Sequence, residues 1–426
     1  MTRDIDEELR LAAEKGDLVQ LREAIARGAQ PNAWPSGTDS ALCYAVMYDH
    51  PDAVKLLVDA GADVRHAGAY NRRPLHHAKR AEIATLLIDH GAELAILDDG
   101  GDDALRHQIT RYDLDDVAAV LLDRGLALIR YTTAPPSVHE PRSHLQWAVF
   151  CKRPRVVRLL LARGCDPKEY SSYGRAVIFE AFSSTAGDGN EIARILIEAG
   201  ARVDERLLPQ LCDRRAPALV AVALAHGGQV NSSALQEAAR VGDLEVLTML
   251  LEHPSAHVDA ADLGGTTALM AAAAAGRGAA VELLLRCGAT PTIRDRDGET
   301  ALHHAAERGD LGVFLQLVKA GCRIDEETEH GWTTLHHVAR STWSANSARI
   351  AEIVLEAGIA VDHRVRDGKT PLMIAASAGS VFVHEVLVQH GADRSLRDAD
   401  GKTEADYARE HAAREQEERE RAERFY

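Results

Sequence analysis

Histidine is the residue type in this sequence that most clearly suggests metal-binding chemistry. The chain contains 20 histidines, and three adjacent pairs occur at His76-His77, His303-His304 and His336-His337. Imidazole is a common zinc ligand, so the pairs raise the question of a metal site. His304 and His337 are separated by about one period of the internal repeat described below, which is too long for both to bind one zinc directly. The sequence has no HExxH pattern. We expect no metal; a site of His304, His337 and an insertion residue is the alternative.

Acidic turns are the second group with possible chemistry. The stretch "RDRDGE" runs from Arg294 to Glu299, and "DDGGDD" runs from Asp98 to Asp103. An EF-hand loop needs glycine at position 6 and an acid at position 12. Counting from Asp295, Gly298 falls at position 4 and Ala306 at position 12. These stretches are therefore interpreted as turns. Phosphate-loop, nucleophile-elbow and dinucleotide-binding motifs are missing from the sequence, and we expect no cofactor.

The chain repeats one pattern along most of its length. The stretch "DGETALHHAAERGDLGVFLQLVKAGCRIDE" (297–326) is followed by the similar "DGKTPLMIAASAGSVFVHEVLVQHGADRSL" (367–396). Glycines after the leucine-rich half recur 33 residues apart, as from Gly288 to Gly321 and from Gly358 to Gly391. Glycine accepts the left-handed conformation that ends a helix, Asp-Gly turns the chain, and Thr caps the next helix. The pattern predicts repeated helix-turn-helix units.

This pattern resembles that of the ankyrin repeat family. The matching stretches include "NRRPLHHA", "DGETALHHAAERGD", "HGWTTLHHVA" and "DGKTPLMIAASAG". The resemblance implies an all-α solenoid of about twelve helix-turn-helix units with short β-hairpin-like fingers, and a function in protein binding. It also implies that the first histidine of each pair is structural and that the second faces the concave groove. Residues 1–408 would form this single solenoid, and 409–426 a charged helical tail. Departures from the pattern predict an enlarged finger at 127–143 and inter-helix insertions at 182–190 and 340–348.

Large aromatic residues concentrate on the expected fingers, first helices and insertions. Tryptophan and tyrosine dominate binding hot spots, so these positions predict a partner-binding surface. Filling of gaps between fingers is the alternative for any one ring. The residues expected to bind a partner or ligand are Trp332, Trp343, His304, His337, Trp147, Tyr44 and Tyr48. A long shallow groove favours an extended polypeptide ligand. The alternative function is an enzyme or small-molecule binder with a pocket near Trp332, Trp343, His304 and His337.

Composition narrows the class of partner. The formal net charge of −16 argues against a general nucleic-acid binder, which needs a basic face. No segment approaches 18 apolar residues without charges, and the N-terminus lacks the apolar core of a secretory signal, so we expect neither a membrane span nor secretion. Six scattered cysteines without a CxxC pair are typical of reduced thiols, and we expect a cytoplasmic or nuclear protein.

Overall fold

The computed structural model describes residues 5–34, 37–111, 115–128, 142–170, 174–183, 189–341 and 345–423. It divides into two compact units, Met1–Arg202 and Val203–Tyr426. Trp343 lies outside the described residues, as do most of the expected enlarged finger and the central parts of both expected insertions.

The described part of the N-terminal unit consists of six helix pairs, one of which begins with a 3₁₀ helix. Its elements are α1 (Ile5–Lys15), α2 (Leu18–Ala26), α3 (Ala41–Met47), α4 (Pro51–Asp59), η1 (Ala69–Asn71), η2 (Pro74–His77), α5 (Ala81–Asp89), α6 (Ala104–Arg111), α7 (Asp115–Asp123), α8 (His144–Phe150), α9 (Pro154–Ala162), α10 (Val177–Glu180) and α11 (Gly189–Glu198).

The described part of the C-terminal unit also contains six helix pairs, followed by one long helix. Its elements are α12 (Leu207–Asp213), α13 (Pro217–Ala225), α14 (Ser232–Val241), α15 (Leu244–Glu252), α16 (Ala268–Ala274), α17 (Gly278–Arg286), α18 (Ala301–Arg308), α19 (Leu311–Lys319), α20 (Thr334–Arg340), α21 (Ala345–Glu356), α22 (Pro371–Ala378), α23 (Val381–Gln389) and α24 (Glu404–Glu423).

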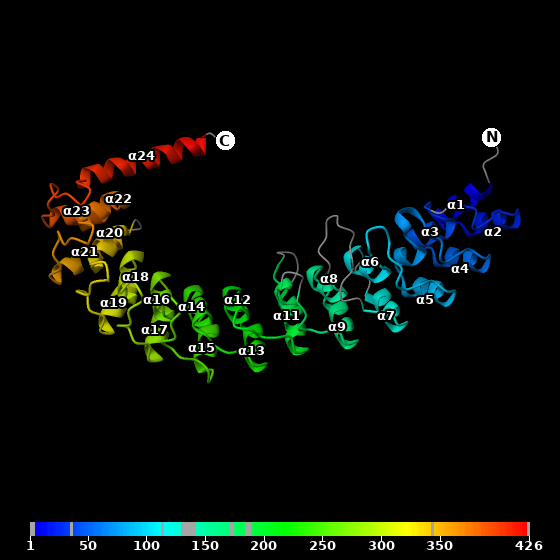
Figure 1. The fold of residues 1–426 in the computed structure, drawn as a ribbon, viewed down its shortest axis with the longest axis horizontal. Coiled ribbons are helices and arrows are strands. Elements are labelled where there is room, and N and C mark those ends of the chain that lie inside the picture. The colour runs from blue at the N-terminus through cyan, green and yellow to red at the C-terminus, as the bar shows by residue number, and fades with distance from the viewer. Residues whose placement is uncertain are drawn as a thin grey trace. The chain divides into compact units, whose positions relative to one another are not determined.

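Each unit is built as two helix layers (Figure 1). In the C-terminal unit, the first helices contact one another in the order α12, α14, α16, α18, α20, α22 and α24. The second helices form the other layer, in which α13, α15, α17, α19, α21 and α23 contact in turn. The N-terminal unit has the same arrangement, with η2 acting as the first helix of its third pair. The prediction of an all-α solenoid of about twelve helix pairs is confirmed.

Local sequence explains how one pair forms. The helix α18 ends at Gly309, which has a φ of 71° and adopts the left-handed conformation that glycine tolerates. Asp310 follows and caps α19, since its Oδ1 accepts the Val313 N–H at 3.0 Å. The apolar face of α19 then buries Val313, Phe314 and Leu317 completely or nearly so. The core elsewhere is mostly alanine, leucine and valine. These small and aliphatic side chains allow the helices to pack closely, in agreement with an aromatic content of only 4 %.

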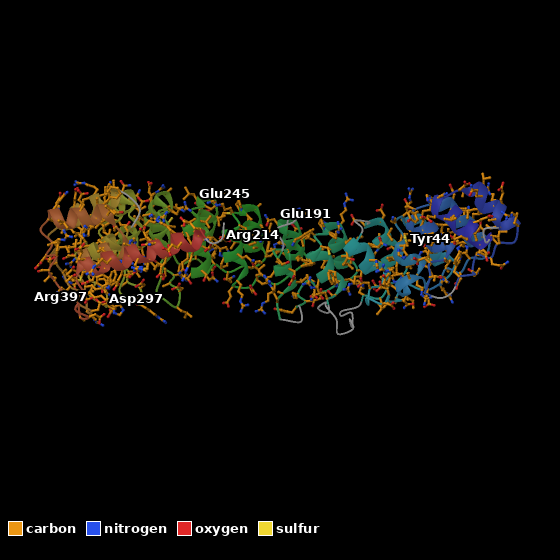
Figure 2. The ribbon with its side chains drawn as sticks, turned by 90° about the horizontal axis from the view of Figure 1, so that it is seen from above. Tyr44, Glu191, Arg214, Glu245, Asp297 and Arg397 are labelled. Atoms are coloured by element: carbon orange, nitrogen blue, oxygen red, sulfur yellow. The ribbon has the colours of Figure 1, made fainter. Side chains whose placement is uncertain are left out.

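The fingers are tight hairpin-like turns that also join neighbouring repeats. The carboxylate of Asp295 accepts the N–H groups of Asp297 and Glu299 at 3.0 and 2.8 Å, which closes the turn. The Glu329 N–H donates to the Asp297 carbonyl of the preceding finger at 2.8 Å. Figure 2 places the finger residues Asp297 and Arg397 along one edge of the C-terminal unit, whereas Glu245, at the start of a second helix, lies at the opposite edge.

The last helix continues the array before it becomes a charged tail. It begins at Glu404, where the Thr403 N–H donates to the Asp406 carboxylate at 2.9 Å. Tyr407 is buried and packs with Met373 of α22. Beyond this first turn the described residues up to 423 are almost all exposed. The first turn of α24 therefore covers the first-helix layer of the C-terminal unit.

Candidate functional site

The first histidine of each pair holds its own repeat to the next one. The Nδ1 atom of His303 accepts the Thr300 N–H at 3.0 Å, so its Nε2 carries the proton and donates to the Glu326 carbonyl at 3.2 Å. His336 makes the same two contacts with Thr333 and with the carbonyl of the following repeat. Burial lowers the pKa of both imidazoles to about 3. Both nitrogens are occupied in structural bonds, in the role that the family resemblance implies.

The second histidine of the His303-His304 pair lies among carboxylates. Its Nε2 is 3.6 Å from Oδ2 of Asp295, and its Nδ1 is 3.6 Å from Oε2 of Glu299. Burial alone would lower the pKa of His304, but Asp295 and Glu299 stabilise the charged form by more than this cost, and the pKa is raised. The His304 side chain is 21 % exposed. It is therefore partly accessible to solvent.

His337 extends this cluster into the next repeat. Its side chain is only 1 % exposed. Its Nε2 lies 3.7 Å from Oε1 of Glu299, and its Nδ1 lies 3.5 Å from Oε2 of Glu307. The half-buried Trp332 covers it, with ring centroids 5.3 Å apart. The cluster therefore runs from the Asp295 finger through α18 to α20.

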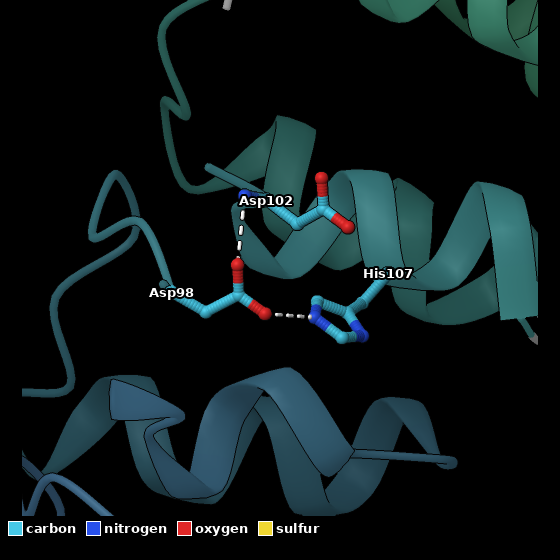
Figure 3. Close-up of side chains that lie close together, drawn as sticks. All are labelled: Asp98, Asp102 and His107. Atoms are coloured by element: carbon cyan, nitrogen blue, oxygen red, sulfur yellow. Dashed lines mark hydrogen bonds and ion pairs between the residues drawn. The ribbon is translucent and has the colours of Figure 1, made fainter. Parts of the chain in front are cut away.

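The equivalent place in the N-terminal unit holds a different set of side chains (Figure 3). The Nε2 of His107 donates to Oδ2 of Asp98 at 2.9 Å, and Arg72 donates to the same oxygen at 3.1 Å. The other oxygen of Asp98 accepts the N–H groups of Gly100 and Asp102. Burial tends to raise the pKa of Asp98, but these donors outweigh it and hold the pKa at about 2. Burial lowers the pKa of His107 to about 4, so the imidazole is neutral at pH 7.

Two aromatic clusters stand on first helices of the N-terminal unit. Tyr44 and Tyr48 of the α3 region stack with centroids 6.3 Å apart, and the Arg10 guanidinium lies 4.8 Å from the Tyr44 ring centre. Tyr48 is 49 % exposed. This cluster presents an accessible aromatic surface with a cation at its edge.

The second aromatic cluster is centred on α8. Trp147 and Phe150 meet edge to face at 5.9 Å, and the Arg142 guanidinium lies within 5.2 Å of Trp147 and 4.2 Å of Phe150. Phe150 is exposed and Trp147 is half-buried. The rings are thus held in position by their neighbours but remain in contact with solvent.

Sequence reasoning identified part of these arrangements. Trp332, His304 and His337 do belong to one neighbourhood, while Trp147 and the Tyr44–Tyr48 pair form separate clusters in the other unit. Glu299 and Glu307, which lie beside the histidines, were not among the predicted site residues. The sequence does contain a signal for Glu299. This residue directly follows the finger glycine and therefore lies beside the first helix of its own repeat.

The comparisons with known proteins define the family. The family model "Ankyrin repeats (3 copies)" matches residues 9–98, 42–132, 211–295 and 269–365, and the model "Ankyrin repeat" matches 367–399. The chain belongs to the ankyrin repeat family, whose repeats are generally protein-interaction modules. Among the residues that the structure describes, no helix combines the length and apolar character needed to cross a membrane.

Three similar proteins match different shares of this chain. The putative ankyrin repeat protein YahD of Escherichia coli is 35 % identical over 202 residues, which are 45 % of this chain and 94 % of that protein. The rat ARF GTPase-activating protein GIT2 is 46 % identical over 52 residues, 12 % of this chain and 7 % of its own length. The ankyrin repeat domain-containing protein SAT10 of Stachybotrys chartarum is 33 % identical over 153 residues, 35 % of this chain and 8 % of that protein. The chain thus spans only a small part of GIT2 and SAT10.

Proposed function

We propose that this protein binds a polypeptide partner on its first-helix face, through aromatic side chains held next to arginines. The observation that carries the proposal is the α8 cluster, where Trp147, Phe150 and Arg142 form an accessible group that is already ordered. Rings held in place before binding lose little side-chain entropy when a partner arrives. Tryptophan, tyrosine and arginine are also the residues most enriched in binding hot spots.

Trp332 supports an equivalent contact in the C-terminal unit. Its ring is half-buried against His337, and the Arg340 guanidinium lies 5.7 Å from its centre. Trp332 therefore has a supporting role as well as a surface that a partner can reach. The partly exposed His304 belongs to the same cluster, since Glu299 lies between it and His337. Neither the comparisons nor the described side chains support the enzymatic alternative.

The cysteines support a proposed location in the cytoplasm or nucleus. All six are free. Burial raises the pKa of Cys43 to about 11 and that of Cys212 to about 12, so both are protonated and unreactive at neutral pH. Unpaired thiols of this kind are typical of reducing compartments.

The test is an affinity pull-down with the full chain, read by mass spectrometry, beside a screen for co-purifying small molecules. Binding of the enriched protein is then measured for wild type, Trp147→Ala and Trp332→Ala. Removal of a hot-spot ring should weaken the binding free energy by about 2 kcal/mol or more, close to a 30-fold loss of affinity. Phe382→Ala is the matched control, because Phe382 is 54 % exposed on the second helix α23. Equal affinity of both tryptophan variants and wild type would reject the proposed surface, as would enrichment of a small molecule alone.

A further inference from the structure

Two imidazoles and three carboxylates alternate along a line that links the first helices α18 and α20. On α18, the two ring nitrogens of His304 each lie 3.6 Å from a carboxylate oxygen, one of Asp295 and one of Glu299. On α20, the ring nitrogens of His337 lie 3.7 Å from the other oxygen of Glu299 and 3.5 Å from an oxygen of Glu307. Glu299 is therefore shared by both rings and connects one repeat to the next.

A neutral imidazole cannot satisfy this arrangement. It has one N–H donor, and its other nitrogen carries a lone pair. Because a carboxylate faces each nitrogen of His304, the neutral ring always turns its lone pair toward a negative oxygen. Only the protonated ring donates from both nitrogens. The separations exceed the usual N–H···O hydrogen-bond length of about 2.9 Å, so these contacts can shorten when the ring gains its second proton.

The net charge of the cluster also favours a proton on His304. With both imidazoles neutral, Asp295, Glu299 and Glu307 carry three negative charges, and Arg340 offsets one of them through its 3.1 Å contact with Glu307. Protonation of His304 reduces the excess from two negative charges to one. The repulsion between the carboxylates then becomes weaker.

The neighbouring imidazoles do not titrate together with His304. The ring of His303 lies 5.0 Å from that of His337, and burial lowers the pKa of His303 to about 3. Burial also lowers the pKa of His336, the histidine before His337, to about 3. Both rings are therefore neutral above pH 5. The adjacent first helices α16 and α22 contain no charged or titratable residue.

Other charged groups on the elements packed around the cluster are paired elsewhere or lie beside it. The fingers before α18 and α20, with α18 itself, also carry Arg294, Arg296, Asp297, Arg308, Asp325, Glu326, Glu327, Glu329 and His330, and the second helices α19 and α21 carry Lys319, Arg349, Glu352 and Glu356. Arg349 pairs with Glu352 and Glu356. Within the described part of the chain, the ion pairs of the two rings are with the three carboxylates of the cluster.

The titration of His304 has a definite direction. Burial tends to lower its pKa, but Asp295 and Glu299 outweigh burial and raise it. The unfolded chain has a histidine pKa of about 6.5, so the folded chain binds this proton more readily. The stability that the proton contributes is fully present below pH 6.5 and is lost as the pH rises through the higher pKa of the folded state.

The flanking carboxylates remain charged over the same range. Burial opposes the ionisation of Asp295, but the contact with His304 outweighs it and lowers the pKa of this carboxyl. The contact with His337 lowers the pKa of Glu307. The pH dependence of the cluster near neutrality therefore comes from the imidazole side.

We propose that His304 is a pH-sensitive link between α18 and α20, which tightens through Glu299 when the ring is protonated and loosens as the pH rises. The His304 side chain is 21 % exposed, so protons reach it from solvent. The ring of Trp332 lies 5.3 Å from that of His337, at the α20 end of the line. The link thus regulates the support beneath Trp332, and this role rests on the proposed function, in which Trp332 binds the partner.

The first measurement is an NMR titration of the full chain with ¹³C-labelled histidine rings. The signal of His304 is assigned by its loss in His304→Gln. We expect its midpoint above pH 6.5, the value of an unperturbed histidine, and a lower midpoint in Glu299→Gln, which removes one of the two carboxylates. A wild-type midpoint at or below about 6.5 would overturn the proposed link.

The second measurement is hydrogen exchange in α18 and α20 of wild type and His304→Gln, at pH 6 and at pH 8.5. Comparison of the two proteins at one pH cancels the intrinsic dependence of exchange on pH. The variant should exchange faster at pH 6, and the ratio of its rate to that of wild type should fall by roughly threefold at pH 8.5, where the wild-type ring loses its proton.

His330→Gln is the matched control. His330 is 60 % exposed and faces only Asp297, at 3.9 Å, so its variant should follow the wild type at both pH values. The side chains of His304 and Glu299 are 21 % and 22 % exposed, so their variants should fold, and circular dichroism verifies this. An equal exchange ratio at the two pH values would reject the link, as would the same pH-dependent change in His330→Gln. Neither measurement uses a partner, so failure of the link and failure of the proposed binding surface are distinguished.

Discussion

The Asp98–His107 pair and the Asp295–His304 pair occupy equivalent places in two repeats, one in each unit. In both, the aspartate closes the finger by accepting N–H groups two and four residues later, and the histidine follows nine residues after it. The Asp98 carboxylate also binds Arg72 and a hydrogen-bonded His107. The Asp295 carboxylate instead faces His304 at 3.6 Å, and further carboxylates surround that histidine.

This difference shows that the repeat sets the position of a side chain and the neighbouring repeats set its chemistry. Burial dominates at His107 and lowers its pKa to about 4. At His304, Asp295 and Glu299 outweigh burial and raise the pKa. The N-terminal pair is a short hydrogen-bonded contact, whereas the C-terminal pair belongs to a set of longer ion pairs between His304 and two carboxylates.

The largest effect in this comparison is expected when the aspartates are removed. Asp98→Ala leaves the buried His107, Arg72 and two backbone N–H groups without their acceptor, and it should destabilise the N-terminal unit by about 3–5 kcal/mol. Asp295→Ala loses the turn hydrogen bonds but only a longer contact to His304, so about 1–2 kcal/mol is expected. Urea denaturation measures both losses of unfolding free energy. Equal losses would show that the two clusters are energetically the same despite their geometry.

A smaller effect concerns the pH dependence of the His107 pair. His107 has a pKa of about 4 in the folded protein and about 6.5 when unfolded, so the unfolded chain binds the proton more readily. Its contribution to stability is fully present above pH 6.5 and is lost as the pH falls towards 4, by up to about 3 kcal/mol. Asp98 does not titrate in this window, because its pKa is about 2.

The measurement compares wild type with His107→Gln in urea at pH 7, 6 and 5. Buried His303 and His336 also have low pKa values and contribute to the same acid sensitivity. The relevant quantity is therefore the difference in free energy of unfolding between wild type and His107→Gln. This difference should shrink as the pH falls. A constant difference across this range would mean that His107 is not held neutral by burial.

Much of the fold was predictable because its signals are local and periodic. Gly309 ends a helix, Asp310 begins the next one, and Leu317 recurs on the buried face, so the sequence alone indicated helix pairs in an all-α array. The candidate sites were less predictable because they depend on side chains of two repeats. The repeat pattern indicated that His337 faces the concave groove, but it did not indicate that Trp332 covers its ring or that Glu299 of the preceding repeat reaches it. Sequence spacing gives the distance along the chain and does not give the direction of these side chains.

The smallest effect is expected at a third copy of the same geometry, in the last finger. Asp398 accepts the N–H groups of Asp400 and Lys402, and nine residues later Tyr407 donates its hydroxyl to the other carboxylate oxygen. Burial and this hydrogen bond raise the pKa of the Tyr407 hydroxyl.

Tyr407→Phe removes the donor but leaves the ring packed against α22 and the backbone donors in place. The free energy of unfolding should therefore fall by about 1–2 kcal/mol. Hydrogen exchange should show faster opening of α24 and α22 while the N-terminal unit is unchanged, because repeats couple mainly to their neighbours. Tyr407→Ala is the control that also removes the buried ring, and it should cost more. If the two variants opened α24 equally, the hydroxyl and not the ring would hold this helix on the array.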